Sequence, residues 1–173
     1  MGAGEEEGIK RVAAAIDRAH AMVPANGVVT CLEVTAGQGS CLGCKLEHLA
    51  GIIDLVKKPK RVGVCLDTAH LFAAGYDFRG RKYSAFIKEL DGVIGISRVQ
   101  VWHVNDSKKE LGSRVDRHAH IGKGFIGLEG FRPLVRDERW AEVPKILETP
   151  KEKDEKGREW DEVNLRVLRR LAK

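Results

Sequence analysis

The sequence lacks the features that mark several classes of protein. Its 173 residues contain no apolar run of the length that spans a membrane, and the first residues show no apolar signal core. The glycine-rich segment TAGQGSCLG lacks the lysine and the spacing of a nucleotide-binding P-loop. We therefore expect a protein without a membrane partner that lies inside the cell, in the nucleus, the cytoplasm or the mitochondrion.

Cysteine is also scarce, with four residues in the chain. Cys41 and Cys44 form a Cys-x-x-Cys motif, which is typical of half a zinc site or of a redox pair. Because the chain has no second motif of this kind, a structural zinc site is not favoured there. Cys31 and Cys65 lie in apolar runs, and we expect both to be small buried residues. This cysteine usage indicates a reduced, intracellular protein.

Neither an internal repeat nor a proline- or serine-rich linker divides the chain. With 43% hydrophobic residues, the length is sufficient for one compact domain, which we expect over residues 1–173. The 30 Lys and Arg residues outnumber the 25 Asp and Glu residues, which gives a net charge of +5 and a pI of about 9.1. This mild basic excess permits a nucleic-acid partner but does not require one.

Helical and extended segments alternate along the chain. Hydrophobic periodicity predicts helices at residues 5–22, 45–57, 83–94, 128–135 and 158–172. Short apolar runs predict strands at residues 28–33, 61–66, 98–102 and 143–147. This order indicates an α/β fold with a parallel sheet, right-handed crossovers and cover on both faces. We expect His20, near the end of the first helix, and His48, outside the apolar stripe of the second, to lie at the surface.

Each predicted strand ends at a residue that can bind a metal ion. These residues are Glu33, Asp67, His103 and Glu148. The carboxyl ends of parallel strands lie on one side of a sheet, where α/β proteins form their sites, so the four side chains should converge. Three carboxylates and an imidazole suit a divalent cation. Any one of these residues alone could cap a helix or lie at the surface, but four such strand ends together favour a site.

A second set of ligand types lies on the loops just past the strand ends. His70 follows the second strand, and Asp116 and His118 lie in the polar segment 101–120. Two histidines and a carboxylate suit a metal site that keeps positions open for substrate. We expect His120 to support a ligand or to be exposed.

Several long segments resemble one known family. They are LEVTAGQGSCLGCKLEHLAGIID, RVGVCLDTAHLFAAGYDFR, HVNDSKKELGSRVDRHAHIGKGFIG and ILETP, between about residues 32 and 150. Here the chain is similar to endonuclease IV, the zinc-dependent DNA repair enzymes of AP endonuclease family 2 that cut at abasic sites. The resemblance implies a (β/α)8 TIM barrel with three zinc ions. Such a barrel needs about 250 residues, so the chain should hold about four βα units, a partial barrel without its N-terminal part.

The resemblance also implies roles for individual residues. The positions that match zinc ligands are Glu33, Asp67, His70, His103, Asp116, His118 and Glu148. Glu33 matches the carboxylate that bridges two ions, the other strand-end residues match the ligands of one of these ions, and the loop residues match the ligands of the third. Two sites are thus fully represented, and the remaining one is represented by Glu33 alone. Glu33, His103 and Glu148 would also take part in catalysis.

Other residues match positions that approach DNA in that family. Gln38 matches a loop residue at the abasic gap, and Arg117, between two ligands, is a candidate phosphate contact. Further basic residues that could bind backbone phosphates are Lys108, Lys109, Arg114 and Lys123. The implied partner is double-stranded DNA with abasic sites, and another chain could supply the missing half of the barrel.

The implied reaction is hydrolysis of the phosphodiester bond 5′ to an abasic deoxyribose by zinc-activated hydroxide, which leaves a 3′-hydroxyl. Two alternatives remain open. The strand-end residues alone would suit a single-metal sugar isomerase or epimerase of a related barrel, although such an enzyme does not need His70, Asp116 and His118. The chain could also be a truncated, inactive member of the family.

Overall fold

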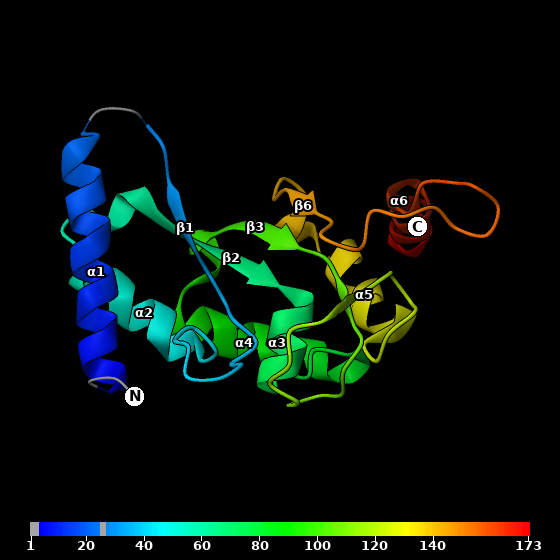
Figure 1. Ribbon diagram of the computed structural model, residues 1–173, viewed down its shortest axis with the longest axis horizontal. Coiled ribbons are helices and arrows are strands. Elements are labelled where there is room, and N and C mark those ends of the chain that lie inside the picture. The colour runs from blue at the N-terminus through cyan, green and yellow to red at the C-terminus, as the bar shows by residue number, and fades with distance from the viewer. Residues whose placement is uncertain (1–3, 25–26) are drawn as a thin grey trace.

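The computed structural model describes residues 4–24 and 27–173, in which helices alternate with the strands of a parallel sheet (Figure 1). The helices are α1 (Glu5–Met22), α2 (Leu46–Leu55), α3 (Thr68–Ala74), α4 (Tyr83–Val93), α5 (Gly127–Arg136) and α6 (Trp160–Ala172). The strands are β1 (Thr30–Glu33), β2 (Val62–Asp67), β3 (Val99–His103), β4 (Asp106–Ser107), β5 (His118–Ala119) and β6 (Lys145–Ile146). The predicted α/β class is confirmed. None of the helices in the two described ranges has the length and apolarity needed to cross a bilayer.

The main sheet contains four parallel strands in the order β1-β2-β3-β6. Glu33 of β1 pairs with Cys65 of β2, and Asp67 of β2 pairs with His103 of β3. The carboxyl ends of these strands therefore lie together at one rim of the sheet. Each strand neighbours the next one of the sheet in chain order, as in the βα repeats of barrel folds, and β1 and β6 form the edges of the described sheet.

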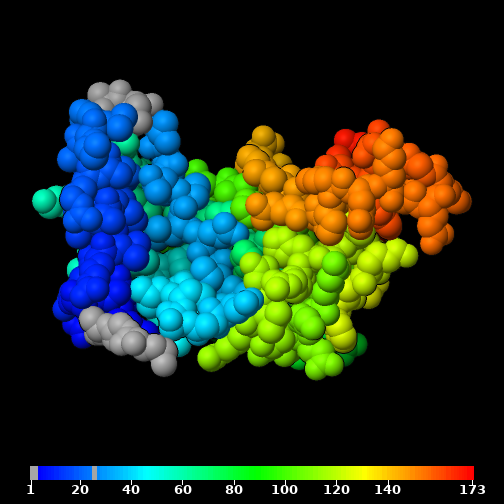
Figure 2. Space-filling model, in the orientation of Figure 1, coloured from blue at the N-terminus to red at the C-terminus, as the bar shows by residue number. Residues whose placement is uncertain are grey.

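The apolar stripe of α2 holds this helix in the core. The members of the predicted stripe that α2 buries are Leu46, Leu49, Ile52 and Ile53. α1 packs against α2 at one end of the molecule, and α6 packs against α5 at the other (Figure 1). Figure 2 shows that the outline is indented between the N-terminal helix in blue and the C-terminal segment in orange. The sheet therefore lies between the α1–α2 pair at one end of the molecule and the α5–α6 pair at the other.

The hydrophobic core lies between the sheet and its helices. Its fully or almost fully buried aromatic side chains include Phe72, Phe78, Phe86, Trp102 and Trp140. Every residue of β2 is buried, whereas the four residues of β1 are only partly buried and Gln100 in β3 is exposed. The predicted cover on both faces is therefore wrong for β1 and for part of β3, because the described helices leave part of the sheet open to solvent.

Several local features differ from the prediction. α3 was not predicted; it begins directly after β2, where the Asp67 carboxylate accepts a hydrogen bond from the His70 N–H at 2.9 Å and caps the helix. β4 and β5 form an antiparallel pair of two residues each, which is too short to give a periodic pattern. β6 covers only the middle of the strand predicted at 143–147. The helix predicted at 128–135 is present as α5, with Pro133 inside it.

The surface positions predicted for two histidines are wrong. His20 is only 4% exposed, and its Nε2 lies 3.0 Å from Oγ1 of Thr30. His48 is equally buried, and its Nδ1 accepts a hydrogen bond from the Gly43 N–H at 3.0 Å. Because a buried imidazole needs a polar partner, both residues join helices to neighbouring chain segments, which periodicity does not reveal.

Candidate metal centre

The carboxyl ends of four strands converge on one group of side chains. Glu33, Asp67 and His103 end β1, β2 and β3, and Glu148 follows shortly after β6. Nδ1 of His103 lies 3.1 Å from Oε1 of Glu33 and 2.9 Å from Oε2 of Glu148. It also lies 3.9 Å from Oδ2 of Asp67. One donor atom from each of the four residues lies within 4.8 Å of the others, so the group could hold a metal ion.

The three residues predicted to lie on loops form a second group beside the first, called the loop group below, although His70 lies in α3 and His118 begins β5. Asp116 stands between the two histidines, with its Oδ2 3.2 Å from Nε2 of His70 and its Oδ1 3.3 Å from Nε2 of His118. Asp67 joins this group, because its Oδ2 lies 3.7 Å from Nε2 of His118. Glu33 does so as well, since its Oε1 lies 3.2 Å from Nδ1 of His70. The two groups are therefore contiguous, and all seven predicted ligands lie together.

Hydrogen bonds to the backbone orient His70 and His118, the two histidines of the loop group. Nδ1 of His70 lies 2.9 Å from the carbonyl oxygen of Val34, and Nδ1 of His118 lies 3.2 Å from that of Glu148. A carbonyl oxygen only accepts, so Nδ1 carries the proton in each neutral ring and Nε2 keeps its lone pair. Both Nε2 atoms are buried and form no hydrogen bond with any described residue. Buried imidazole nitrogens fixed in this way have the arrangement of metal ligands, so these residues fit a cation.

Negative charge also gathers in this region. Burial alone would lower the pKa of His70, but Glu33, Asp67 and Asp116 raise it to about 9. Burial raises the pKa of Asp67, whereas His70 and His103 outweigh burial and lower the pKa of Glu33. The centre therefore favours a positive charge, and a divalent cation can supply it.

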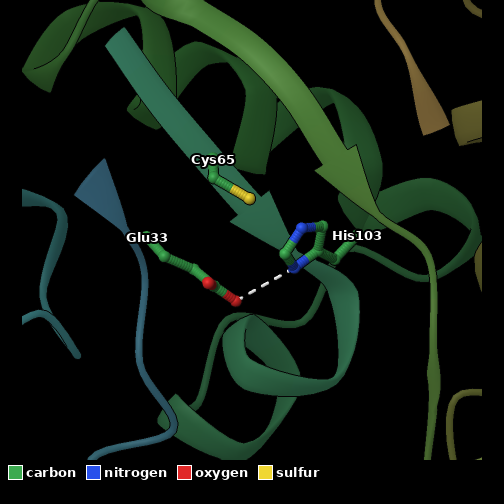
Figure 3. A group of neighbouring side chains, drawn as sticks. All are labelled: Glu33, Cys65 and His103. Carbon is green, nitrogen blue, oxygen red and sulfur yellow. Dashed lines mark hydrogen bonds and ion pairs between the residues drawn. The ribbon is translucent and has the colours of Figure 1, made fainter. Parts of the chain in front are cut away.

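A thiol also reaches the strand-end group. Figure 3 shows Cys65 on β2 with its side chain beside Glu33 and His103. The three donor atoms lie within 4.8 Å of one another. Cys65 is buried, as predicted, whereas Cys31 is only partly buried. The sequence pattern predicts that Cys65 only packs in the core. Because Cys65 precedes Asp67 by two residues, however, the two side chains lie on the same face of the strand.

Comparison with known proteins identifies the family of the fold. A family model described as the xylose isomerase-like TIM barrel matches residues 1–171. The chain belongs to this xylose isomerase-like TIM-barrel family. The expected barrel family is thus confirmed, and the sheet of four parallel strands is consistent with a partial barrel.

Relatives of this barrel family also confirm the resemblance to endonuclease IV. The chain is 51% identical over 172 residues to a protein of Chloroflexus aurantiacus named probable endonuclease 4. The match covers 99% of this chain and 59% of that protein. A protein of Geobacter sulfurreducens with the same name is 51% identical, and the match covers 100% of this chain and 58% of that protein. The solved endonuclease IV from Thermus thermophilus matches with a TM-score of 0.80 and 37% identity, over 94% of this chain and 57% of that one. The chain spans about three fifths of the length of these relatives.

Asn105 holds residues of two neighbouring segments together at the carboxyl rim of the sheet. The residue is fully buried, and its side-chain amide donates to Oδ2 of Asp67 at 2.7 Å. Its side-chain oxygen accepts the backbone N–H of Glu148 at 2.8 Å. Asn105 therefore fixes two candidate ligands relative to each other. Sequence reasoning missed it, although its place two residues after His103 was a usable signal.

A single carboxylate organises the loop that carries Asp116 and His118. Asp106 is fully buried. It accepts hydrogen bonds of 2.8–3.3 Å from the backbone N–H groups of Ser107, Gly122, Gly124, Ile126 and Gly127. A Cβ on Gly124 would collide with Asp106 and with the Ser107 carbonyl, so the chain can approach this closely only with glycine. Sequence reasoning did not single out Asp106 either.

A further polar network fixes α6 to the same rim. Asn164 of α6 is fully buried; it accepts from the Ile121 N–H at 3.0 Å and its amide lies 3.2 Å from Nδ1 of His120. The same amide donates to Oγ1 of Thr149, next to Glu148, at 3.0 Å. His120 stacks on Trp160, with ring centroids 3.8 Å apart and planes 8° apart. The supporting role expected for His120, rather than exposure, agrees with this arrangement.

The residues predicted to approach DNA are exposed, and two of them form hydrogen bonds with the Asp116 backbone. Gln38 is exposed, and its Oε1 accepts the Asp116 N–H at 3.1 Å. Arg117 is exposed and donates to the Asp116 carbonyl at 2.6 Å. Arg114 has a left-handed backbone, with φ of 54°. It is exposed, as are Lys108, Lys109 and Lys123. Gln38 and Arg117 thus hold the segment of a candidate ligand, while their contacts with DNA remain predictions.

Proposed function

We propose that this chain carries the metal centre of a DNA repair endonuclease that hydrolyses the phosphodiester bond 5′ to abasic sites. The observation that supports this most strongly is the second ligand group, in which two buried Nε2 atoms form no hydrogen bond with a described residue and lie 3.2 and 3.3 Å from the Asp116 carboxylate. The names of the relatives, probable endonuclease 4, support the nuclease class.

Zinc is the cation we propose for the centre. Imidazole nitrogens with carboxylate oxygens suit zinc better than magnesium or calcium, which prefer oxygen donors alone. Asp67, His103 and Glu148 would hold one ion together with Glu33, and the loop group would hold another. When bound, zinc polarises the phosphodiester and lowers the pKa of water toward neutrality.

The exposure of the ligands indicates where a substrate would approach. The side chains of Asp116 and Glu148 are 48% and 44% exposed, whereas that of Asp67 is fully buried. The first two would face the scissile phosphate, and Asp67 would hold the centre from the side of the sheet. Glu33, His103 and Glu148 are the residues we assign to catalysis.

Basic side chains next to this open side would bind the DNA backbone. Arg114 and Arg117 flank Asp116, and Lys108 lies at the start of the same loop, with its N–H bonded to the Arg117 carbonyl at 2.9 Å. Exposed arginine and lysine side chains bind phosphates without reading sequence. Gln38 would reach the gap left by the missing base. Double-stranded DNA with an abasic site is therefore the partner that we propose.

The remaining strands of the barrel are a second proposed partner. A closed barrel of this family has eight strands, and β1 and β6 lie at the edges of the four-stranded sheet described here. A segment from another chain would complete the barrel between these edges. The length of the relatives supports this proposal.

The test is incision of a duplex that carries one tetrahydrofuran abasic analogue, with the chain alone and with the remaining segment of the Chloroflexus aurantiacus relative added. We expect zinc-dependent cleavage that leaves a 3′-hydroxyl. His118→Ala should lower the rate by about a hundredfold or more, and Glu47→Gln, an exposed carboxylate on α2, should leave it unchanged.

Two outcomes would contradict the proposal. Conversion of a sugar without incision would support the isomerase alternative, in which the loop group has no role. Absence of incision both with and without the added segment would indicate an inactive member of the family.

A further inference from the structure

The Cys-x-x-Cys motif lies in the loop between β1 and α2 and takes no part in the candidate metal centre. Cys41 is exposed, Cys44 is partly buried, and neither forms a disulfide. Within residues 4–24 and 27–173, neither thiol belongs to a group of side chains that could hold a metal ion. Of the two uses that the sequence motif allows, a redox pair therefore fits these thiols better than half a zinc site.

Thr35 holds the first part of the motif in a folded position. Its hydroxyl donates to the Leu42 carbonyl at 2.9 Å and lies 3.6 Å from Sγ of Cys41. Its backbone N–H donates to the Gly43 carbonyl at 3.1 Å. Gly43 has a φ of 100°, which favours glycine, and a Cβ there would lie only 3.0 Å from the Thr35 methyl group. The chain between the two cysteines therefore wraps around Thr35.

Cys44 lies against the same segment that holds Cys41. A Cβ on Gly37 would lie 3.0 Å from Cβ and 3.4 Å from Sγ of Cys44, so the glycine lets this side chain come close. Thr35 and Gly37, which contact the two cysteines, are separated by at most about 7 Å of chain. Disulfides join residues whose Cα atoms are about 4.4–6.8 Å apart. Side-chain rotation and a small shift of the loop can therefore join the two thiols.

Both thiols line one surface cavity of about 530 Å³. Figures 1 and 2 show the loop of the motif beside the first turns of α1, which form the other side of the cavity. The charged side chains of the lining are those of Arg11, Lys45, Arg114 and Glu5. Three cations and one carboxylate leave a positive excess, which attracts anionic reactants.

We propose that Cys41 and Cys44 form a dithiol that a small anionic disulfide, such as that of glutathione, converts reversibly into an intramolecular disulfide. The thiolate of Cys41, the more exposed residue, attacks one sulfur of the small disulfide and releases one thiol molecule. The thiolate of Cys44 then attacks Sγ of Cys41 and releases the second. The protein loses two electrons and two protons, and the small disulfide gains both, so no other oxidant takes part. The inference is independent of the proposed nuclease function.

The pair also lies close to a residue that is proposed to approach DNA. Gln38 precedes Cys41 by three residues, and its Oε1 accepts the Asp116 N–H at 3.1 Å. A disulfide restricts the conformations of the chain that it closes. Oxidation of the motif would therefore act on the loop that carries Gln38.

The experiment equilibrates the full chain, under nitrogen, with mixtures of reduced and oxidised glutathione. N-ethylmaleimide then alkylates the remaining thiols, and peptide mass spectrometry locates the bonds. We expect a Cys41–Cys44 disulfide in the unaltered chain and in Cys31→Ser, the control in β1. In Cys44→Ser the reaction should stop at a glutathionyl group on Cys41, because the second thiol is missing.

The role of charge is tested by the rate of the first step with two disulfides, that of glutathione and the positively charged cystamine. Arg114→Gln should slow the reaction with glutathione disulfide by about threefold or more and should not slow the reaction with cystamine. Arg114→Lys is the matched control, because it keeps the charge, and both rates should stay the same. Equal slowing of both reactions in Arg114→Gln would overturn the preference for an anionic disulfide.

Separate glutathionyl groups on both cysteines, a disulfide between two chains, or no reaction at the motif would overturn the inference. None of these results bears on the proposed nuclease function, because the assay contains no DNA. Dibromobimane gives a second test on the unaltered chain, since it becomes fluorescent when it bridges two thiols. We expect a bridge between Cys41 and Cys44, and its absence would show that the two thiols cannot approach each other.

Discussion

Replacing Asp106 by asparagine should strongly lower the free energy of unfolding, although the change replaces only one carboxylate oxygen by an NH2 group. One oxygen of this carboxylate accepts from Ser107 and Ile126, and the other accepts from Gly122, Gly124 and Gly127. Asparagine has a single acceptor oxygen. At least two backbone N–H groups would then face an NH2 group, which cannot accept them.

The expected magnitude follows from this count of lost acceptors. A buried donor left without a partner costs about 1–3 kcal/mol, so Asp106→Asn should lower the free energy of unfolding by about 2–6 kcal/mol. Domains of this size are stable by about 5–15 kcal/mol in total. The variant should therefore be close to unfolding, and the loop with Asp116 and His118 should lose its fixed position.

Urea denaturation followed by tryptophan fluorescence measures this loss. The matched control is Asp91→Asn, because Asp91 is exposed and accepts one backbone bond, from the Ile96 N–H at 3.0 Å. That change should cost no more than about 0.5–1.5 kcal/mol. Equal stability of the two variants would refute the argument that Asp106 alone organises the loop.

Three further changes test other parts of the structure. His118→Ala should remove one bound zinc ion in native mass spectrometry, and an unchanged count would contradict the proposed loop site. Asn164→Leu should lower the free energy of unfolding by about 1–3 kcal/mol, measured in urea, because the Ile121 N–H and the Thr149 hydroxyl lose their partner; a neutral effect would mean that α6 is held by its apolar face alone. Burial lowers the pKa of His20 in the folded protein, so the unfolded chain binds more protons and stability should decrease as the pH falls below about 6.5. In urea titrations at several pH values this decrease should be smaller in His20→Gln, and an equal decrease would show that other groups cause it.

Much of the fold was predictable because it depends on periodicity. α1 has the predicted bounds, and the four strands of the main sheet lie within or next to the predicted runs. The convergence of Glu33 with Asp67 and His103 also followed from one rule, since parallel strands end on the same side. These features require only the order of polar and apolar residues along the chain.

The remaining features depend on contacts between distant segments. His48 is buried because the Gly43 N–H and Glu5, 43 residues earlier, meet its two ring nitrogens. Cys65 was indistinguishable from a packing residue until Glu33 of the neighbouring strand was placed beside it. The five hydrogen bonds that Asp106 accepts likewise form only when the loop folds back over about 20 residues. A pattern along one strand or helix carries no information on such partners.

The chain order of the sheet has a consequence for synthesis on the ribosome. Each strand of the order β1-β2-β3-β6 can pair with one already made, so the sheet can grow as the chain emerges. The four strand-end donors emerge in the same order, and Glu148 is the last of them, before α6 and its Asn164 contacts. Capture of a metal ion by this group would therefore be complete only after Glu148 has emerged, and a nascent chain stalled before β6 would lack this donor.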